Sequence, residues 1–337
     1  MTNVVVDGLR ARGVTLDPLY QEGKLVRLTW DSSEPILGTR AMVVIPDMHF
    51  AAGDGGDVFA FGSTPTPLAR LGSLVDGLVG FKTSYEASGR RLSVLQLGDL
   101  YDVWRAYPEY VDHPTSDYGV IESAYGGVIG NLMDACDARV CVGNHDATMA
   151  NYPPSWARNA NGPNGRLAYA QAFVSGKILG FHGHQVDQMV EAMGSQSGEA
   201  AARVATILAK LSSSLSQLIQ QNVDFAIDFF ADPSPQQLVD VALRQWPSST
   251  SLTDTSVFQS PRWCDREHPE HLRALIEGIS GASMVRIAFV GHSHRPGVTG
   301  VTVGSRFVPV IDVGSWVWGA SQIAIAVEGE VSLWTVS

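Results

Sequence analysis

The chain has 337 residues, of which 45% are apolar and 17% charged, enough for one large domain with a full hydrophobic core. Its 23 basic and 34 acidic residues give a net charge of −11. Proteins that grip the nucleic-acid backbone normally carry a basic excess, so this balance disfavours duplex binding as the main function. The three cysteines show no CxxC spacing, which argues against a disulfide framework and a thiolate zinc site.

The N-terminal residues 1–13 contain Asp7 and no long apolar run, so we expect no secretory signal. No stretch of the sequence approaches the ~18 uninterrupted apolar residues that a membrane-spanning helix needs. We therefore expect a soluble, cytoplasmic protein. Cys136 and Cys141 flank a short apolar run and are expected to be buried as small hydrophobic residues.

Short apolar runs that end at a glycine or a polar cluster predict strands. They are apolar on consecutive residues, which is typical of strands covered on both faces. Apolar residues at three- and four-residue spacing predict helices at 68–87 and 118–136, and the alternating stretch 322–335 predicts a closing hairpin. The predicted strands are 41–46, 91–98, 138–143, 177–183, 285–291 and 307–314.

Residues 185–270 interrupt this pattern. From Glu199 to Phe230 the apolar residues follow a helical repeat, which predicts a long helix or helix pair with an apolar stripe from Val204 to Phe229. We interpret the segment as a helical cap inserted into a single domain of residues 1–337, with ordinary core helices as the alternative. The stripe is a candidate lid, or a candidate contact in a homo-oligomer.

Metal-ligating and acid–base side chains follow five of the predicted strands, at the carboxyl ends where the ligand sites of open α/β folds form. Each fragment alone is a weak signal, because Asp-x-His and Gly-Asn-His-Asp also occur in ordinary turns. Imidazoles and carboxylates at five successive strand ends are hard to explain by structure alone. The fragments are Asp47-Met48-His49, Gly98-Asp99 with Asp102, Gly143-Asn144-His145-Asp146, His182, and Gly291-His292-Ser293-His294.

This ordered set resembles the calcineurin-like metallophosphoesterase family, whose blocks are D-x-H, G-D-x-x-D, G-N-H-D/E, H and G-H-x-H. The resemblance extends from Asp47 to His294, which is most of the chain. It implies an α/β fold, a four-layer α-β-β-α sandwich of two mixed sheets, with the site on loops at one edge of the sandwich.

The resemblance also implies the role of each residue. His145 would protonate the leaving oxygen or stabilise its charge, and Asp146 would orient that imidazole. Two divalent ions are implied, and mixed nitrogen and oxygen ligands suit manganese, iron, zinc or cobalt, with manganese favoured. The implied ligands of the first ion are Asp47, His49 and His294, and those of the second are Asn144, His182 and His292, with Asp99 bridging both.

Some residues near these motifs indicate which branch of the family the chain resembles. Asp102-x-Trp104 and the helical insertion give a weaker likeness to the UDP-2,3-diacylglucosamine pyrophosphohydrolase branch. That branch usually has Gly-Asp after the lone histidine, where this chain has Gly183-His184. The segment Gly314-Ser315-Trp316 resembles a late segment of several bacterial members and is expected to be structural.

The substrate is less closely defined. Val103-Trp104-Arg105 stands where protein serine/threonine phosphatases usually have Arg-Gly, which argues against that branch. Asp102 and Arg105 are candidate substrate-binding residues, although a surface arginine is the alternative for Arg105. We expect hydrolysis of a phosphodiester or pyrophosphate bond in a small-molecule or lipid-linked ester. A broad phosphomonoesterase or a nuclease is the alternative enzyme, and a non-catalytic scaffold is disfavoured because every ligand position is retained.

Overall fold

The computed structural model describes most of the residues that lie outside the predicted cap. It describes residues 3–21, 24–25, 27–29, 40–53, 57–60, 65–107, 118–150, 154–157, 169–175, 177–186, 269–278, 285–327 and 330–337. The predicted apolar stripe from Val204 to Phe229 lies outside the described residues. Its role as a lid or an oligomer contact therefore stays a prediction.

The larger of two sheets has eight strands and is mixed. Its strands are β1 (Leu16–Pro18), β4 (Arg27–Thr29), β5 (Arg40–Ile45), β6 (Arg91–Gln96), β7 (Arg139–Cys141), β8 (Tyr169–Ala170), β14 (Gln322–Val327) and β15 (Glu330–Val336). The order is β1-β15-β14-β5-β6-β7-β8, with β4 paired to β15. The strands β5 to β8 run parallel, whereas β14 joins them antiparallel to β5.

The smaller sheet has five strands and is also mixed. They are β9 (Ala172–Ser175), β10 (Ile178–Phe181), β11 (Ile287–Val290), β12 (Gly297–Val303) and β13 (Arg306–Asp312), in the order β12-β13-β11-β10-β9. The three central strands β10, β11 and β13 run parallel, and both edge strands are antiparallel to their neighbours. A separate pair consists of β2 (Tyr20–Gln21) and β3 (Lys24–Leu25).

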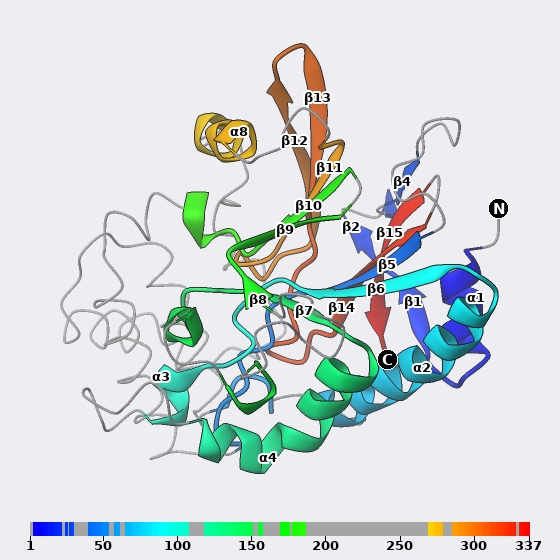
Figure 1. Cartoon of the computed structure of the whole chain (residues 1–337), viewed down its shortest axis with the longest axis vertical. Coiled ribbons are helices and arrows are strands. Elements are labelled where there is room, and N and C mark those ends of the chain that lie inside the picture. The colour runs from blue at the N-terminus through cyan, green and yellow to red at the C-terminus, as the bar shows by residue number, and fades with distance from the viewer. Residues whose placement is uncertain are drawn as a thin grey trace, which may run out of the picture.

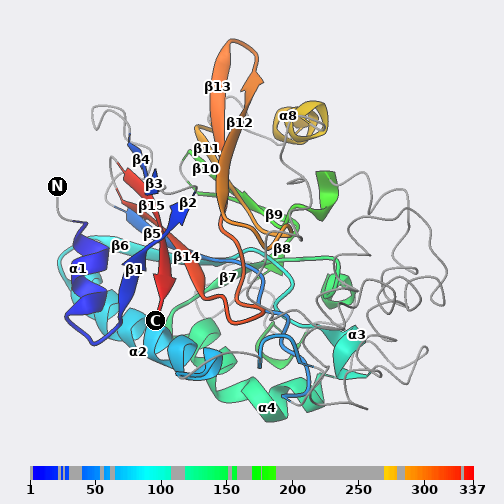
Figure 2. The same ribbon diagram turned by 180° about the vertical axis from the view of Figure 1, so that it is seen from behind.

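Helices cover the outer faces of both sheets. The described helices are α1 (Val4–Arg10), α2 (Pro67–Ala87), α3 (Val103–Ala106), α4 (Gly119–Gly130) with a π-helical turn (Asn131–Ala135), and α8 (Pro269–Gly278). Figure 1 and Figure 2 show α1, α2 and α4 along the larger sheet and α8 beside the β12–β13 hairpin. Leu272 and Ile276 of α8 pack on Val301 and Val310 of that hairpin.

The strand β5 shows why its residues are apolar on consecutive positions. Side chains alternate between the faces of a strand, so Ala41, Val43 and Ile45 join the core beneath the helices, whereas Met42 and Val44 join the core between the two sheets. Both cores are hydrophobic and buried. The layers are therefore helix, sheet, sheet and helix, as the resemblance implies.

Local signals set the helix boundaries. The hydroxyl of Thr66 accepts a hydrogen bond from the backbone N–H of Ala69 at 3.2 Å, and Pro67 opens α2, an arrangement that favours a helix start. Among the described residues, no helix is both long enough and apolar enough to cross a bilayer. Cys136 and Cys141 are free and buried, as predicted, and burial raises the pKa of Cys136 to about 12.

A buried carboxylate organises the loop that follows β5. Asp57 is completely buried and accepts backbone N–H groups at 2.8–3.3 Å and the hydroxyl of Tyr125 at 2.7 Å. The ring of Tyr125 in turn stacks on Phe50 with the centroids 4.6 Å apart. The backbone donors belong to Ala51, Gly53, Phe59 and Ala60.

Replacing Asp57 by alanine should destabilise the protein. Each buried donor left without an acceptor costs about 1–3 kcal/mol, so we expect Asp57→Ala to lower the free energy of unfolding by at least about 3 kcal/mol. Asp57→Asn, which keeps one acceptor oxygen, should lose less. Urea denaturation followed by circular dichroism measures both, with Asp76→Ala on the exposed side of α2 as the control. Equal stability of Asp57→Ala and wild type would contradict this role.

Candidate metal centre

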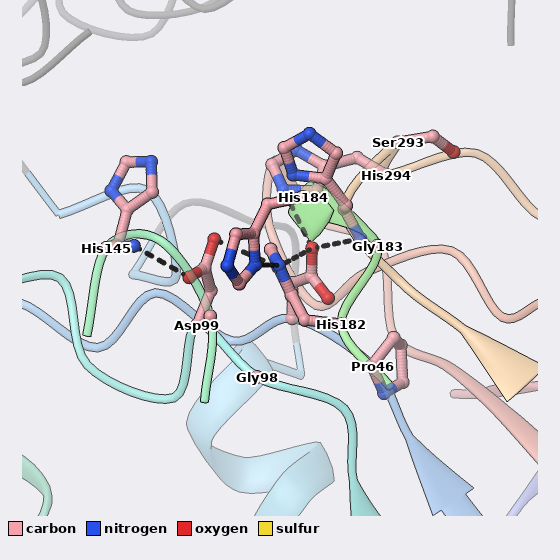
Figure 3. A network of polar contacts seen from close by, with 12 residues as sticks. Pro46, Gly98, Asp99, His145, His182, Gly183, His184, Ser293 and His294 are labelled. Atoms are coloured by element: carbon pink, nitrogen blue, oxygen red, sulfur yellow. Dashed lines mark hydrogen bonds and ion pairs between the residues drawn. The ribbon is translucent and has the colours of Figure 1, made fainter. Parts of the chain in front are cut away.

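The predicted site residues follow parallel strands from both sheets. Asp47 and Asp99 come after β5 and β6, His145 after β7, and His182 and His292 after β10 and β11. Because the carboxyl ends of parallel strands meet at one edge of a sheet, these side chains lie on the same edge of the sandwich. Figure 3 shows Asp99, His182 and His294 gathered there, with His145 beside Asp99.

Two buried carboxylates face one buried imidazole at the centre of the site. The Nε2 atom of His182 lies 3.2 Å from Oδ2 of Asp99 and 3.5 Å from Oδ2 of Asp47. All three side chains are at most 2% exposed. Removing like charges from water is unfavourable unless opposite charges are close, so the two aspartates require positively charged neighbours.

Two further imidazoles complete this environment. Nε2 of His294 lies 3.3 Å from Oδ2 of Asp47, and Nε2 of His49 lies 3.5 Å from Oδ2 of Asp99. The two Nε2 atoms are only 3.0 Å from one another. Two imidazole nitrogens directed at the same small volume beside carboxylates are typical of ligands for a cation.

Three sets of ligand atoms lie within 4.8 Å of one another in the described part of the chain. The first set, Asp47, His49 and His294, is the predicted ligand set of the first ion. Asp99 belongs to the other two, one with His182 and Asp47 and one with His49 and His145. This position between groups agrees with a bridging role, which itself stays a prediction.

Unsatisfied buried atoms indicate that the site fits divalent ions. Asp47 Oδ1 and Asn144 Oδ1 are buried without a hydrogen-bond partner, although such atoms are nearly always paired in folded proteins. Both belong to predicted metal ligands, and a bound cation would satisfy them. The ring centroid of His292 lies 5.0 Å from that of His182. The ligand roles of Asn144 and His292 stay predictions.

The histidines and aspartates shift one another's protonation. Burial alone would raise the pKa of Asp99, but His182, His145 and His49 bring it well below its ordinary value. Burial would lower the pKa of His182, but Asp99 and Asp47 outweigh it and raise that pKa well above its ordinary value. The aspartates are therefore ionised, which is the state that binds metal ions.

The backbone adopts a sparsely populated conformation at four of these residues. His49, Asp99, His292 and His294 have φ angles of 51°, 49°, 72° and 56°, in the left-handed region that residues other than glycine rarely adopt. Such residues persist only where the surrounding structure holds them, and they concentrate at functional sites. The loops are thus shaped to direct side chains rather than to minimise backbone energy.

Two glycines make room for the carboxylates. A Cβ on Gly143 would overlap the Asp99 side chain, and a Cβ on Gly291 would overlap Oδ1 of Asp47. The glycine of the Gly-Asn-His-Asp fragment and that of the Gly-His-Ser-His fragment are therefore required by the close approach of neighbouring loops.

Asp102 connects His49, a predicted metal ligand, to His145. Its Oδ2 lies 3.1 Å from Nδ1 of His49, 3.2 Å from Nδ1 of His145 and 3.0 Å from Nε of Arg105. Burial would raise the pKa of Asp102, but His145, His49 and Arg105 bring it well below its ordinary value. An ionised carboxylate at this place fixes both imidazoles with Nδ1 toward Asp102, which leaves Nε2 of each for other partners.

The carboxylate of Asp146 contacts the backbone, and its predicted role in orienting His145 stays a prediction. Its carboxylate accepts the backbone N–H groups of Leu100 and Gly143 at 2.8 and 2.6 Å, so it ties the loop after β6 to the loop after β7. Burial and the nearby Asp99 raise the pKa of Asp146 to about 7. Asp102 contacts the His145 ring, with its Oδ2 3.2 Å from Nδ1.

Arg105 is not the surface arginine that was the alternative, since its side chain is only 2% exposed. It pairs with Asp102, which is completely buried. Asp102 also contacts His49 and His145, and substrate binding by Asp102 or Arg105 stays a prediction.

Asp312 is a supporting residue that was not predicted from the sequence. It is buried, and it accepts hydrogen bonds from the hydroxyl of Ser293, between His292 and His294, and from the N–H of Gly314. Asp312 is the last residue of β13 and lies inside the predicted strand 307–314, two residues before Gly314-Ser315-Trp316; its place beside this segment was the signal that could have indicated it. The backbone N–H of Trp316 donates to the backbone oxygen of Asp47 at 2.8 Å, which agrees with a structural role for this segment.

His184 contacts a predicted ligand. Its Nδ1 lies 2.9 Å from Nδ1 of His182. One nitrogen donates and the other accepts, and Nε2 of His182 faces the aspartates. His184 therefore stands where a group that orients a ligating histidine is expected.

No family model matches the chain, and comparison with curated proteins finds no match either. Among solved structures, the chain is similar to a conserved protein from Streptococcus pneumoniae described as a predicted phosphoesterase, with 13% identity, a TM-score of 0.28, and coverage of 85% of this chain and 83% of that one. It is also similar to the Thermus thermophilus sulfate thiohydrolase SoxB, with 11% identity and a TM-score of 0.32, over 91% of this chain and 58% of that one. Conclusions about chemistry therefore depend on the site itself.

Removing the Asp99 carboxylate should empty the metal centre. Asp99→Ala deletes the side chain that lies between the ligand groups, so we expect the metal content per chain to fall well below that of wild type, with circular dichroism unchanged. Elemental analysis after equilibration with manganese measures this, and the exposed Asp76→Ala should bind like wild type. Full metal content in Asp99→Ala would contradict the assignment.

A methyl group at Gly143 should disturb the same site from the backbone. The added Cβ of Gly143→Ala overlaps the Asp99 carboxylate and must push it aside, which should weaken metal binding and cost about 1–3 kcal/mol of stability. Gly127→Ala in α4, which has nothing within 4 Å of the new methyl, is the matched control and should be as stable as wild type or more so. Metal titration and thermal unfolding of both variants provide the comparison.

Proposed function

We propose that the protein is a metal-dependent hydrolase of phosphate esters that cleaves a phosphodiester or pyrophosphate bond. The observation that carries the proposal is the convergence of Asp47, Asp99, His49, His182 and His294 on one small volume, with ligand atoms left unsatisfied there. Two divalent ions bound there would polarise a phosphoryl oxygen and lower the pKa of a water molecule. Manganese is the favoured ion.

His145 supplies the acid that such a reaction needs. Burial would lower its pKa, but Asp102 and Asp99 outweigh this effect and raise it above the ordinary value. Its side chain is 14% exposed, so part of it is in contact with solvent. With Nδ1 toward Asp102, Nε2 is the atom that can hold a proton and deliver it to the leaving oxygen of the ester.

The hydrolytic proposal is supported over a non-catalytic scaffold by the His145–Asp102 contact. A structural metal site has no need for an additional imidazole that is directed by a carboxylate and left partly accessible. The chain's net charge of −11 supports a small or lipid-linked ester over a nucleic-acid duplex. A broad phosphomonoesterase is the second candidate.

A substrate panel distinguishes these alternatives. The purified protein, with and without manganese, is assayed on bis-p-nitrophenyl phosphate, p-nitrophenyl phosphate, a nucleoside diphosphate conjugate and single-stranded DNA. Metal-dependent turnover of the diester or pyrophosphate above the others supports the proposal. Preference for the monoester or the DNA supports one of the alternatives, and absence of turnover in metal-loaded protein supports a scaffold.

Replacing His145 should slow the reaction without emptying the site. We expect His145→Ala and His145→Gln to retain their metal ions and to lose about 10²–10⁴-fold in kcat, the usual contribution of general acid catalysis. The loss should be smaller for p-nitrophenol than for an alkyl alcohol as leaving group, because the more acidic phenol hardly needs a proton. Equal losses for both leaving groups would count against the acid role.

A further inference from the structure

The short helix α3 holds three side chains in a fixed arrangement around His145. Asp102 is its N-cap, and Oδ1 of Asp102 accepts the backbone N–H of Arg105 at 3.1 Å. The Arg105 side chain returns to the same carboxylate, on Oδ2. Trp104 lies between them in the sequence and is only 7% exposed, so its indole is held inside the fold.

The indole of Trp104 packs directly on the imidazole of His145. The ring centroids are 4.1 Å apart and the planes are inclined by 40°. The ring of His49 meets the same imidazole edge-on, with the centroids 4.5 Å apart and the planes at 84°. Asp102 contacts Nδ1, so the His145 ring is contacted by an aromatic face, a second imidazole and a carboxylate.

These contacts constrain different motions of the ring. The ion pair with Asp102 fixes the position of Nδ1 but leaves the ring free to tilt about the line through that contact. A flat aromatic surface against the imidazole opposes this tilt, and tryptophan provides a large, rigid surface with only two side-chain torsions. Catalytic groups need this kind of restraint, because a displacement of about 1 Å can cost about 100-fold in rate.

We propose that Trp104 is a positioning residue for the hydrolysis proposed above, on which this inference rests. Its indole holds the His145 imidazole in the plane that directs Nε2 toward the leaving oxygen. Trp104 carries no group that ligates a metal ion, so its contribution acts through His145 and not through the metal centre. The same helix therefore supplies both the carboxylate and the aromatic surface that orient the acid.

A double-mutant cycle tests this role. Trp104→Ala should lower kcat on an alkyl phosphodiester about 10-fold to 100-fold, with metal content and KM close to wild type. Trp104→Phe should restore most of the activity, because it keeps an aromatic surface. In the His145→Ala background, Trp104→Ala should have almost no further effect, since the ring that it positions is absent. Trp104→Leu, which keeps an apolar side chain, gives the same comparison if the alanine variant does not fold.

The control is a tryptophan of the other end of the fold. The Cζ atom of Arg10 lies 5.2 Å from the ring centroid of Trp334 in β15, and the indole N–H of Trp334 donates to the hydroxyl of Ser332. These contacts are away from the site, so Trp334→Ala should leave kcat unchanged. Additive losses in Trp104→Ala and His145→Ala, or loss of metal ions from Trp104→Ala, would overturn the positioning role and leave the proposed function intact. Absence of turnover by the metal-loaded wild type on every ester would overturn the proposed function and this role with it.

Discussion

The structure of the site depends on the burial of two carboxylates, Asp47 and Asp99, against one imidazole. Carboxylates without access to water are tolerated only when positive charge is close, and here His182 stands within 3.5 Å of both. That requirement explains why loops from both sheets converge, since β5 and β6 bring the aspartates and β10 brings the histidine. It also explains why small residues, such as Gly143 and Gly291, occupy the positions beside the carboxylates.

The scaffold satisfies this requirement through parallel strands in both sheets. Strands β5, β6 and β7 in one sheet and β10, β11 and β13 in the other end at the same edge of the sandwich. The apolar layer between the sheets, which includes Val44 and Ile311, holds the two sets of loops together. The hydrogen bonds of Asp146 and Asp312 then tie individual loops to one another. Stability and ligand geometry therefore depend on the same contacts.

Much of this arrangement could be predicted from the sequence because periodicity and motif order are local signals. The run 41–46 corresponds to β5 and the run 68–87 to α2, and the site residues Asp47, His49 and His294 come together as the motifs indicate. The strand β12 was missed, because its glycines and threonines interrupt the apolar pattern. Helix α8 was also missed, since the interpreted insertion ended at residue 270 and no element was predicted between it and the strand 285–291.

The contacts of the supporting residues could not be predicted in the same way. Asp102 and Asp146 are both acidic residues beside a ligand, and only the three-dimensional path of the loops decides which one meets the His145 ring. The same is true of Trp104, whose contact with His145 joins residues of two different loops. A sequence shows which groups are available, whereas their partners depend on the packing of distant segments.

The left-handed backbone at His49, Asp99, His292 and His294 has a consequence for how the protein can change over generations. Each of these residues holds the chain in a conformation that disfavours folding by roughly 1–3 kcal/mol, and glycine would relieve that cost. On backbone grounds alone, a screen for heat resistance would therefore favour glycine over the predicted ligands at these positions. Selection for thermal stability and selection for turnover would act in opposite directions at these four positions. A related protein that retains the four residues would therefore have been under stronger selection for turnover than for stability.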